Sequence, residues 1–453
     1  MENKENFIEN ISILLEKKDF KAIVKELSEL QPVDIAESAQ MFSLKERAIL
    51  YRLLPKDIAT EVFVELDSDM QEELIAGFTD NELYGVLSEL FVDDTVDIIE
   101  EMPASVVRRI IKNCPNDMRG HINSILAFDK NTAGSIMTPE YIALKPQMTV
   151  KEAIEHIRQQ SLDSETVYTL YVKDSKRKLI GVVTVRELFL ASDDEKIRNI
   201  MNENVIYVET LSDREEAAKL LDKYGFLALP VTDKEKRLVG IITVDDAIDV
   251  LQEEFTEDVS KMAAVMPIEE SYFKTSVFKH SLSRILWLIV LMVSATVTGF
   301  IITHYEEAFK AVPLLIACIP MLMGTGGNCG SQASTMIIRG LATDEISLKD
   351  VFKVWWKEIR ISLIVGVVLA VVNTLRVFLL YGISGEIISL AITNALALLF
   401  TAALAQSLGC LLPMGAKAVK LDPAIMAAPL ITTIVDALSV MVFFMVAVWV
   451  FAM

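Results

Sequence analysis

The chain has 453 residues, of which 52% are hydrophobic, and a formal net charge of −20. Residues 283–453 hold nine acids and ten Lys or Arg, so 54 acids and 33 bases, a net charge of −21, fall in residues 1–282. An acidic front half repels phosphate, which excludes nucleic acid as a partner and favours cations. The four cysteines show no paired spacing, so neither a disulfide framework nor a zinc site is expected.

The first part of the chain predicts an all-α superhelical N-domain over residues 1–130. Its start, "MENKENFIENISILLEKKDF", has the pattern of an amphipathic helix and lacks the apolar core of a signal peptide, so the front half is expected in the cytoplasm. Four similar segments then begin at Pro32, Pro55, Thr79 and Pro103, with offsets of 23, 24 and 24 residues. Proline or a capping Thr opens each helix, and a repeat of this size is typical of a small α-solenoid.

A second repeat predicts an α/β domain over residues 131–252. Two segments each start with Ile-Met, continue with a helix and two β-branched strands around a Lys-rich turn, and close with another helix. The closing stretches "LIGVVTVREL" and "LVGIITVDDA" resemble those of cystathionine β-synthase (CBS) modules. The resemblance implies a tandem pair that forms one regulatory unit, with modules at 137–195 and 201–252.

Five apolar runs predict an α-helical transmembrane domain over residues 283–453. They lie at about 284–304, 312–338, 353–381, 386–413 and 424–451, and each meets the roughly 20-residue length that spans a bilayer. Ten bases lie before the first run, between the second and third, and between the fourth and fifth, whereas the alternate loops hold Lys310, with Arg376 near one end. The positive-inside rule therefore predicts a multi-pass protein of the plasma membrane with a cytoplasmic N-terminus and an external C-terminus.

The last apolar run, "MAAPLITTIVDALSVMVFF", carries Asp436 near its middle. A carboxylate at that depth costs roughly 3 kcal/mol on insertion scales. Pro429, Thr432 or Thr433, Asp436 and Ser439 fall on one helical face. The alternatives are a protonated acid buried in the bundle and an acid on a water-lined polar face, and the lack of a base at similar depth favours the second.

The second run contains "IPMLMGTGGNCGSQAST", in which Pro320, Gly324, Gly327 or Asn328, and Ser331 share one face. Small residues of this kind are typical of close helix packing in membranes. The side-chain oxygens and the glycine-exposed carbonyls make a pore lining an equally good interpretation.

An acidic run precedes the membrane part. Seven of the fourteen residues from 245 to 258 are acids, and the N-domain offers Asp93 and Asp97 one helical turn apart. Such acids repel one another unless cations neutralise them. The ordinary interpretation is a solvated face, but the run leads directly into a predicted connecting helix over 253–282, where a cation-sensitive element would act on the membrane part.

Taken together, the helical N-domain, the CBS pair, the acidic connector and the five spans resemble the MgtE magnesium channels. The stretches "GTGGNCGSQAST", "LDPAIMAAPLITTIVDALS" and "EEFTEDVSKMAAV" are similar to that family's signatures. The resemblance implies a homodimeric Mg²⁺-selective channel for import, with the pore built mainly from the second and fifth spans. Asp436 then corresponds to the pore acid that holds hydrated Mg²⁺, Asp422 to the acid at the cytoplasmic pore end, and Asn328, with Gly324, Gly327, Thr432 and Thr433, to the lining.

The resemblance also implies Mg²⁺ ions between the soluble parts, which close the pore when they bind. The residues carried over as their ligands are acids: Asp93, Asp97, Glu215, Asp246, Asp249, Glu254, Glu257 and Asp258. Some family members bind ATP in the CBS pair, where Arg186, Glu187 and Phe226 occupy the corresponding region. Glu187 departs from the commoner Asp, which leaves nucleotide binding open.

Two other functions compete with a magnesium channel. Carboxylates and backbone oxygens also suit Co²⁺ or Mn²⁺, so a transporter of another divalent ion with the same sensor is the alternative. A membrane-embedded enzyme is not expected, because the back half has only His280 and His304, both at span ends, and no nucleophile–base pair.

Overall fold

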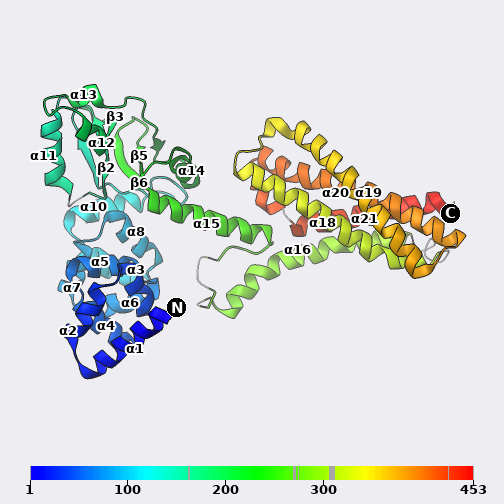
Figure 1. Cartoon of the computed structure of the whole chain (residues 1–453), viewed down its shortest axis with the longest axis horizontal. Helices are drawn as coiled ribbons and strands as arrows, with labels where there is room; N and C mark the ends of the chain where they lie inside the picture. Colours follow the sequence, from blue (N-terminus) through cyan, green and yellow to red (C-terminus); the bar gives the residue numbers. More distant parts are fainter. Residues whose placement is uncertain are drawn as a thin grey trace. The chain divides into compact units, whose positions relative to one another are not determined.

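The computed structural model describes residues 2–161, 164–268, 272–273, 275–305, 312–426 and 428–451. The chain divides into two compact units, Met1–Gln252 and Glu253–Met453. The first holds the helical N-domain and the CBS pair, and the second holds the membrane helices (Figure 1).

The N-domain is a stack of short helices, as the repeat predicts. The helices are α1 (Glu2–Lys17), α2 (Phe20–Ser28), α3 (Pro32–Ala39), α4 (Leu44–Leu53), α5 (Lys56–Val64), α6 (Ser68–Gly77), α7 (Asp80–Leu87), α8 (Val92–Glu101), α9 (Ala104–Asn113) and α10 (Asn116–Ile125). The four predicted starts are confirmed: Pro32 opens α3, and Pro55, Thr79 and Pro103 are the N-caps of α5, α7 and α9. Thr79 forms a capping box, in which its backbone N–H donates to the Glu82 carboxylate at 2.7 Å.

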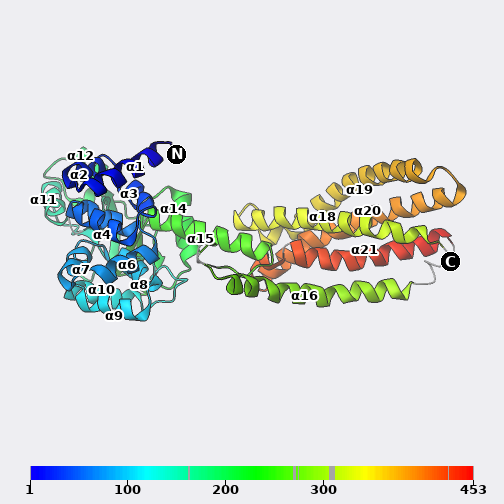
Figure 2. The same cartoon turned by 90° about the horizontal axis from the view of Figure 1, so that it is seen from below.

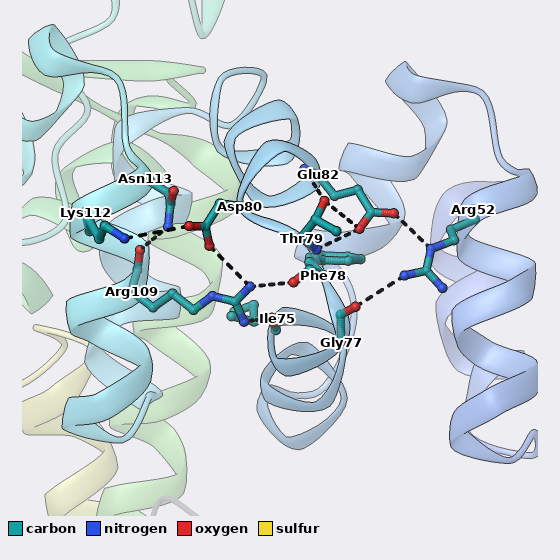
Figure 3. Close-up of polar contacts among 10 residues, drawn as sticks. All are labelled: Arg52, Ile75, Gly77, Phe78, Thr79, Asp80, Glu82, Arg109, Lys112 and Asn113. Atoms are coloured by element: carbon teal, nitrogen blue, oxygen red, sulfur yellow. Dashed lines mark hydrogen bonds and ion pairs between the residues drawn. The ribbon is translucent and has the colours of Figure 1, made fainter.

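Two arginines fasten neighbouring helices of this stack around the end of α6. Arg109 on α9 donates to the carbonyls of Ile75 and Phe78, and Arg52 on α4 donates to that of Gly77 at 3.3 Å (Figure 3). The last carbonyls of a helix have no partner within the helix, so these guanidinium groups replace the missing donors. Side chains thus bridge helices that lie far apart in the sequence.

Each CBS module contains a three-stranded sheet. The strands are β1 (Tyr141–Leu144), β2 (Thr166–Lys173) and β3 (Leu179–Thr184) in the first module, and β4 (Val208–Glu209), β5 (Ala228–Thr232) and β6 (Leu238–Thr243) in the second. The accompanying helices are α11 (Val150–Gln160), α12 (Val185–Leu190), α13 (Ile197–Ile200) and α14 (Arg214–Tyr224). In both modules the first strand pairs parallel with the second, and the second pairs antiparallel with the third.

The two modules exchange their Ile-Met segments. An added Cβ at Gly240 in β6 would lie 2.8 Å from the Met137 sulfur, and one at Gly181 in β3 would lie 2.8 Å from the Met201 sulfur. The start of each module therefore packs on the last strand of the other, and only glycine leaves room for it. One apolar core also runs from the N-domain into the second module, from Ile11 to Val250, which makes this unit continuous.

Within the described residues, the membrane unit contains five helices long and apolar enough to cross a membrane, as the hydropathy pattern predicts. They are α16 (Val277–His304), α18 (Leu314–Ala342), α19 (Val351–Tyr381), α20 (Gly385–Ala418) and α21 (Ala428–Phe451), with short 3₁₀ helices η2 (Leu348–Asp350) and η3 (Pro423–Met426). Helix α20 packs against α18, α19 and α21, whereas α16 packs against α21 at the edge of the bundle (Figure 2).

The structure corrects the predicted connecting helix over 253–282. Helix α15 (Val244–Met262) carries the acidic run but ends at Met262, and α16 begins only at Val277. Ala264 adopts a left-handed φ of 54°, and the N–H groups of Ala264 and Val265 donate to the carbonyls of Lys261 and Ser260. This pair of bonds is a Schellman motif, which stops a helix. Pro267 follows shortly after and cannot continue it.

Candidate ion-binding sites

Asp436 lies on α21 where that helix meets α18. Its side chain is half-buried, and no hydrogen bond or ion pair joins it to another residue in the described part of the chain. Gly327 of α18 faces it, because an added Cβ there would lie 3.0 Å from Thr432 Cγ2 and 3.7 Å from Asp436 Oδ1. An acid in a membrane helix needs a polar environment, and the residues that the structure describes give Asp436 no hydrogen bond or ion pair.

Helix α18 presents two different faces. Gly326 and Gly330 are buried, and a Cβ at either would press within 2.7 Å of α21 side chains. Gly324 has nothing within 4 Å, and Asn328 is exposed beside it. The exposed face continues with Gln332 and Thr335. Close packing therefore involves one face of this helix, whereas the exposed polar residues lie on the opposite face.

The threonines before Asp436 direct their hydroxyl hydrogens into their own helix. Thr432 Oγ1 and Thr433 Oγ1 donate to the Pro429 carbonyl at 3.0 and 2.9 Å. Each hydroxyl oxygen therefore keeps lone pairs for a cation or for the water bound to one. Both side chains are half-buried.

Asp422 precedes η3 and has both carboxylate oxygens engaged. Its Oδ1 accepts the Ala424 N–H at 2.8 Å, and its Oδ2 forms an ion pair with Lys261 at 2.7 Å. Lys261 also pairs with Glu257 at 2.7 Å. Two acids named as metal ligands from the sequence, Asp422 and Glu257, thus meet around one ammonium group.

In the first unit, acids from separate segments converge between the N-domain and the CBS pair. Burial together with the charges of Asp246, Glu165 and Asp94 raises the pKa of Asp93 well above its usual value. Burial, then neighbouring acids, raises the pKa of Asp94 to about 7 and that of Glu165 to about 8. We call Asp93, Asp94, Glu140, Glu165 and Asp246 the acidic cluster.

Hydrogen bonds from backbone N–H groups and threonine hydroxyls hold the cluster. Glu140 accepts the N–H of Val92, at the start of α8, at 2.9 Å. Thr243 donates its hydroxyl to Asp246 at 2.6 Å, and burial nevertheless raises the pKa of Asp246 to about 6. Carboxylates so placed repel one another and desolvate one another, so this arrangement favours protons or cations.

The structure brings together only some of the predicted ligands. Asp97 and Asp249 are exposed, although the charge of Asp249 contributes to the raised pKa of Asp246. Glu215 pairs with Lys219 on α14 at 2.6 Å, and Glu254 and Asp258 lie half-buried on α15. Among the residues that the structure describes, no three His, Cys, Asp or Glu side chains are arranged to hold one ion directly.

Sequence reasoning missed three members of the acidic cluster, Asp94, Glu140 and Glu165. Asp94 adjoins Asp93 in "VDDTVD", so its neighbour was a signal. Glu140 and Glu165 stand alone at either end of the segment around α11, and only the tertiary fold brings them to α8.

The region expected to bind a nucleotide is built from helix caps. Glu187 accepts from the backbone N–H and the hydroxyl of Thr184 at 2.7 and 2.9 Å, which completes the capping box of α12. Arg186 is exposed beside it, and Phe226 stacks on Tyr224 with ring centroids 5.4 Å apart. The Glu187 carboxylate is therefore committed to the backbone in this structure.

Comparison with known families defines the class of protein. The model of a family described as a divalent cation transporter matches residues 319–446, that of the MgtE intracellular N domain matches 30–131, and that of the CBS domain matches 133–194 and 197–253. With five helices long and apolar enough to cross a bilayer, the chain is a multi-pass membrane protein of the divalent cation transporter class.

Similar proteins make the family specific. The chain is 34% identical over 437 residues to a magnesium transporter MgtE of Thermus thermophilus, with 96% of each chain covered, and 30% identical to one of Bacillus subtilis, with 95% and 93% covered. The chain belongs to the MgtE family. Its first half also resembles a crystal structure of the cytosolic domain of the Mg²⁺ channel MgtE in complex with ATP, with 35% identity, a TM-score of 0.51, and 54% of this chain and 99% of that chain covered.

A second solved structure agrees. A crystal structure of the soluble part of a magnesium transporter is 29% identical to this chain, with a TM-score of 0.52. The match covers 55% of this chain and 99% of the chain in that structure. Relatives of this kind are named as transporters, and no catalytic activity is indicated for the family.

Proposed function

We propose that this chain forms a homodimeric, Mg²⁺-selective channel that imports magnesium across the cell membrane and is closed by Mg²⁺ bound to its acidic soluble parts. The observation that carries the proposal is that Asp436, beside the exposed polar face of α18, has no hydrogen bond or ion pair within the described residues. Its relatives are named magnesium transporters, which supports Mg²⁺ as the ion.

The polar face argues for a second copy. Gly324, Asn328, Gln332 and Thr335 are exposed in this chain although they lie within a membrane-spanning helix. Lipid does not satisfy amide and hydroxyl groups, so this face needs water or another polar surface. A two-fold axis beside α18 and α21 would place two copies of Asp436 around a shared aqueous path and supply both.

Hydrated Mg²⁺ fits these groups. The ion dehydrates reluctantly and is often held through its water by one or two carboxylates. Two Asp436 side chains, with the oxygens of Thr432, Thr433 and Asn328 nearby, would bind such an aqua ion without direct coordination by three protein ligands. The same logic suits the acidic cluster, whose carboxylates converge without forming a direct three-ligand site.

The acidic cluster supports control by intracellular Mg²⁺. A cation bound between Asp93, Glu165 and Asp246 relieves their repulsion and favours the packed arrangement of N-domain and CBS pair. If the packed arrangement closes the pore, Mg²⁺ binding and pore closure are thermodynamically linked. A rising Mg²⁺ concentration then shifts the population towards the closed state. Asp97, Glu215, Asp249, Glu254 and Asp258 are proposed to contribute at neighbouring positions.

The distribution of bases supports an inward-facing front half. The loops expected inside hold ten Lys or Arg, and the N-terminal unit would face the cytoplasm with the C-terminus outside. ATP is proposed as a further ligand of the CBS pair, near Arg186, Glu187 and Phe226, because the cytosolic domain similar to this one is in complex with ATP.

Uptake of magnesium tests the pore. We expect Asp436→Asn to lower Mg²⁺ uptake into proteoliposomes to background, at least roughly tenfold, because the ion loses its charged partner. Glu386→Gln, an exposed acid in the first turn of α20, is the matched control and should retain uptake. If Asp436→Asn transports as well as the parent, the pore assignment is wrong, and if Mn²⁺ or Co²⁺ is carried in preference to Mg²⁺, the alternative ion is correct.

A further inference from the structure

Lys261 bridges two acids that belong to different segments of the membrane unit. It lies in the last turn of α15, and its ammonium is 2.7 Å from Glu257 Oε1 and 2.7 Å from Asp422 Oδ2. Its side chain is only 25% exposed, and those of Glu257 and Asp422 are 39% and 30% exposed. This is a three-member charged contact that is partly withdrawn from solvent.

Backbone bonds fix both ends of the bridge. The Ala424 N–H holds one oxygen of Asp422, so only the other oxygen is directed at Lys261. On the opposite side, the Schellman motif at Ala264 ends α15 immediately after Lys261, and Met266 N–H then donates to the Ser283 carbonyl of α16 at 3.0 Å. The lysine is therefore presented by one fixed helix end to one fixed loop.

We propose that Lys261 is a positioning residue whose ammonium group acts as a tethered cation between Glu257 and Asp422, holding the end of α15 to the start of α21 without a bound metal ion. The inference rests on the proposed function in one respect, because that function makes α15 the connector to the pore helix α21.

A tethered cation changes what a divalent ion does at this position. Glu257 and Asp422 have the chemistry of Mg²⁺ ligands, but the ammonium already occupies the position between them, so an ion must displace it to bind there. Part of the contact between connector and pore helix is then independent of Mg²⁺. The Mg²⁺ dependence of gating would arise from the other acids.

Hydrogen–deuterium exchange of the full-length protein in detergent tests this role. Lys261→Gln removes the charge, Lys261→Arg keeps it, and Lys420→Gln removes an exposed lysine from the loop that carries Asp422, as a matched control. Without Mg²⁺ we expect Lys261→Gln to speed amide exchange in residues 253–262 and 421–426 by roughly three- to tenfold, as for the loss of a partly exposed ion-pair network. Lys261→Arg should remain close to the parent.

Added Mg²⁺ supplies the second readout. In Lys261→Gln the two acids are left facing each other, so Mg²⁺ should slow exchange in both segments and restore the parent's protection. Unchanged exchange in Lys261→Gln, or the same change in Lys420→Gln, would show an ordinary surface pair and overturn the proposal. Exchange in α20 reports general unfolding, which would affect every segment alike.

This experiment is independent of transport. If Asp436→Asn fails to reduce Mg²⁺ uptake, the proposed function falls, but exchange at 253–262 and 421–426 still decides the role of Lys261. If uptake behaves as proposed and exchange does not respond to Lys261→Gln, only the tethered cation is wrong.

Discussion

At the scale of single residues, glycine distinguishes the two faces of α18. Gly326 sits where an added Cβ would be 2.7 Å from Ser439 Oγ and 2.7 Å from Thr401 Cγ2, both below the closest approach that real side chains show. Gly324, half a turn away, has nothing within 4 Å. One glycine is therefore required by packing, whereas the other borders the proposed aqueous path.

Alanine at these two positions gives opposite expectations for stability. Replacing a glycine within a helix by Ala favours the helix by about 1 kcal/mol, so Gly324→Ala should leave the melting temperature in detergent unchanged or slightly raised. In Gly326→Ala the overpacking costs about 1–3 kcal/mol, which exceeds that gain and lowers the melting temperature. Equal melting temperatures for the two variants would contradict the assignment of faces.

At the scale of elements, local sequence rules predicted starts of helices better than their ends. Pro32, Pro55, Thr79 and Pro103 mark real helix starts because proline and capping threonine act within one turn. The end of α15 was missed because Ala264, rather than glycine, takes the left-handed conformation that stops the helix.

In the candidate sites too, features local in the sequence could be predicted, whereas contacts that depend on the tertiary fold could not. Asp436 was found because an acid in an apolar run is visible without any structure. Glu140 and Glu165 were not, because their proximity to α8 depends on how the N-domain packs on the CBS pair. The sequence gives Lys261 no role, because its bridge to Asp422 spans more than 150 residues of sequence.

The contribution of Arg109 to the stability of the N-domain helices can be measured. It donates to the carbonyls of Ile75 and Phe78 and lies 3.6 Å from Asp80, with its side chain 29% exposed (Figure 3). Removing it takes the guanidinium donors away from the Phe78 carbonyl and from the Ile75 carbonyl, which keeps only the Phe78 N–H, so Arg109→Met should destabilise this helix by about 1–3 kcal/mol. Faster amide exchange in α6 would report the loss.

Lys112 is the matched control for Arg109. It also approaches Asp80, at 3.7 Å, but its side chain is 75% exposed. An exposed pair of this kind contributes about 0–1 kcal/mol, so Lys112→Met should leave exchange in α6 close to that of the parent. Equal effects of the two variants would mean that charge at Asp80, rather than the carbonyl contacts, stabilises α6.

At the scale of the whole molecule, the two halves carry their acids differently. The first unit gathers carboxylates at the contact between N-domain and CBS pair, and every charge that raises the pKa of Asp93 or Glu165 is another acid. The membrane part has few acids and keeps Asp436 alone on its polar face. Carboxylates in such surroundings favour a nearby cation or proton, so under the proposed function both parts share a dependence on Mg²⁺.

Because of this shared dependence, protons and Mg²⁺ should substitute for each other at the acidic cluster. Without metal, the pKa values of Asp246, Asp94 and Glu165 are raised to about 6, 7 and 8. A raised acid stabilises the folded contact fully below its unfolded pKa of about 4, and this stabilisation is lost as pH rises through the folded value. The contact should therefore loosen between about pH 4 and pH 8, and bound Mg²⁺ should prevent the loosening.

Limited proteolysis of the full-length protein tests whether protons and Mg²⁺ substitute for each other at the acidic cluster. At pH 8 without Mg²⁺ we expect cleavage between the N-domain and the CBS pair, and at pH 5.5, or at pH 8 with millimolar Mg²⁺, we expect protection. Asp93→Asn combined with Glu165→Gln removes two of the repelling charges, so it should protect at pH 8 without metal, while Glu101→Gln, an exposed acid at the end of α8, should behave like the parent. Cleavage that is the same at both pH values, with and without Mg²⁺, would show that the acidic cluster does not control how these two domains pack.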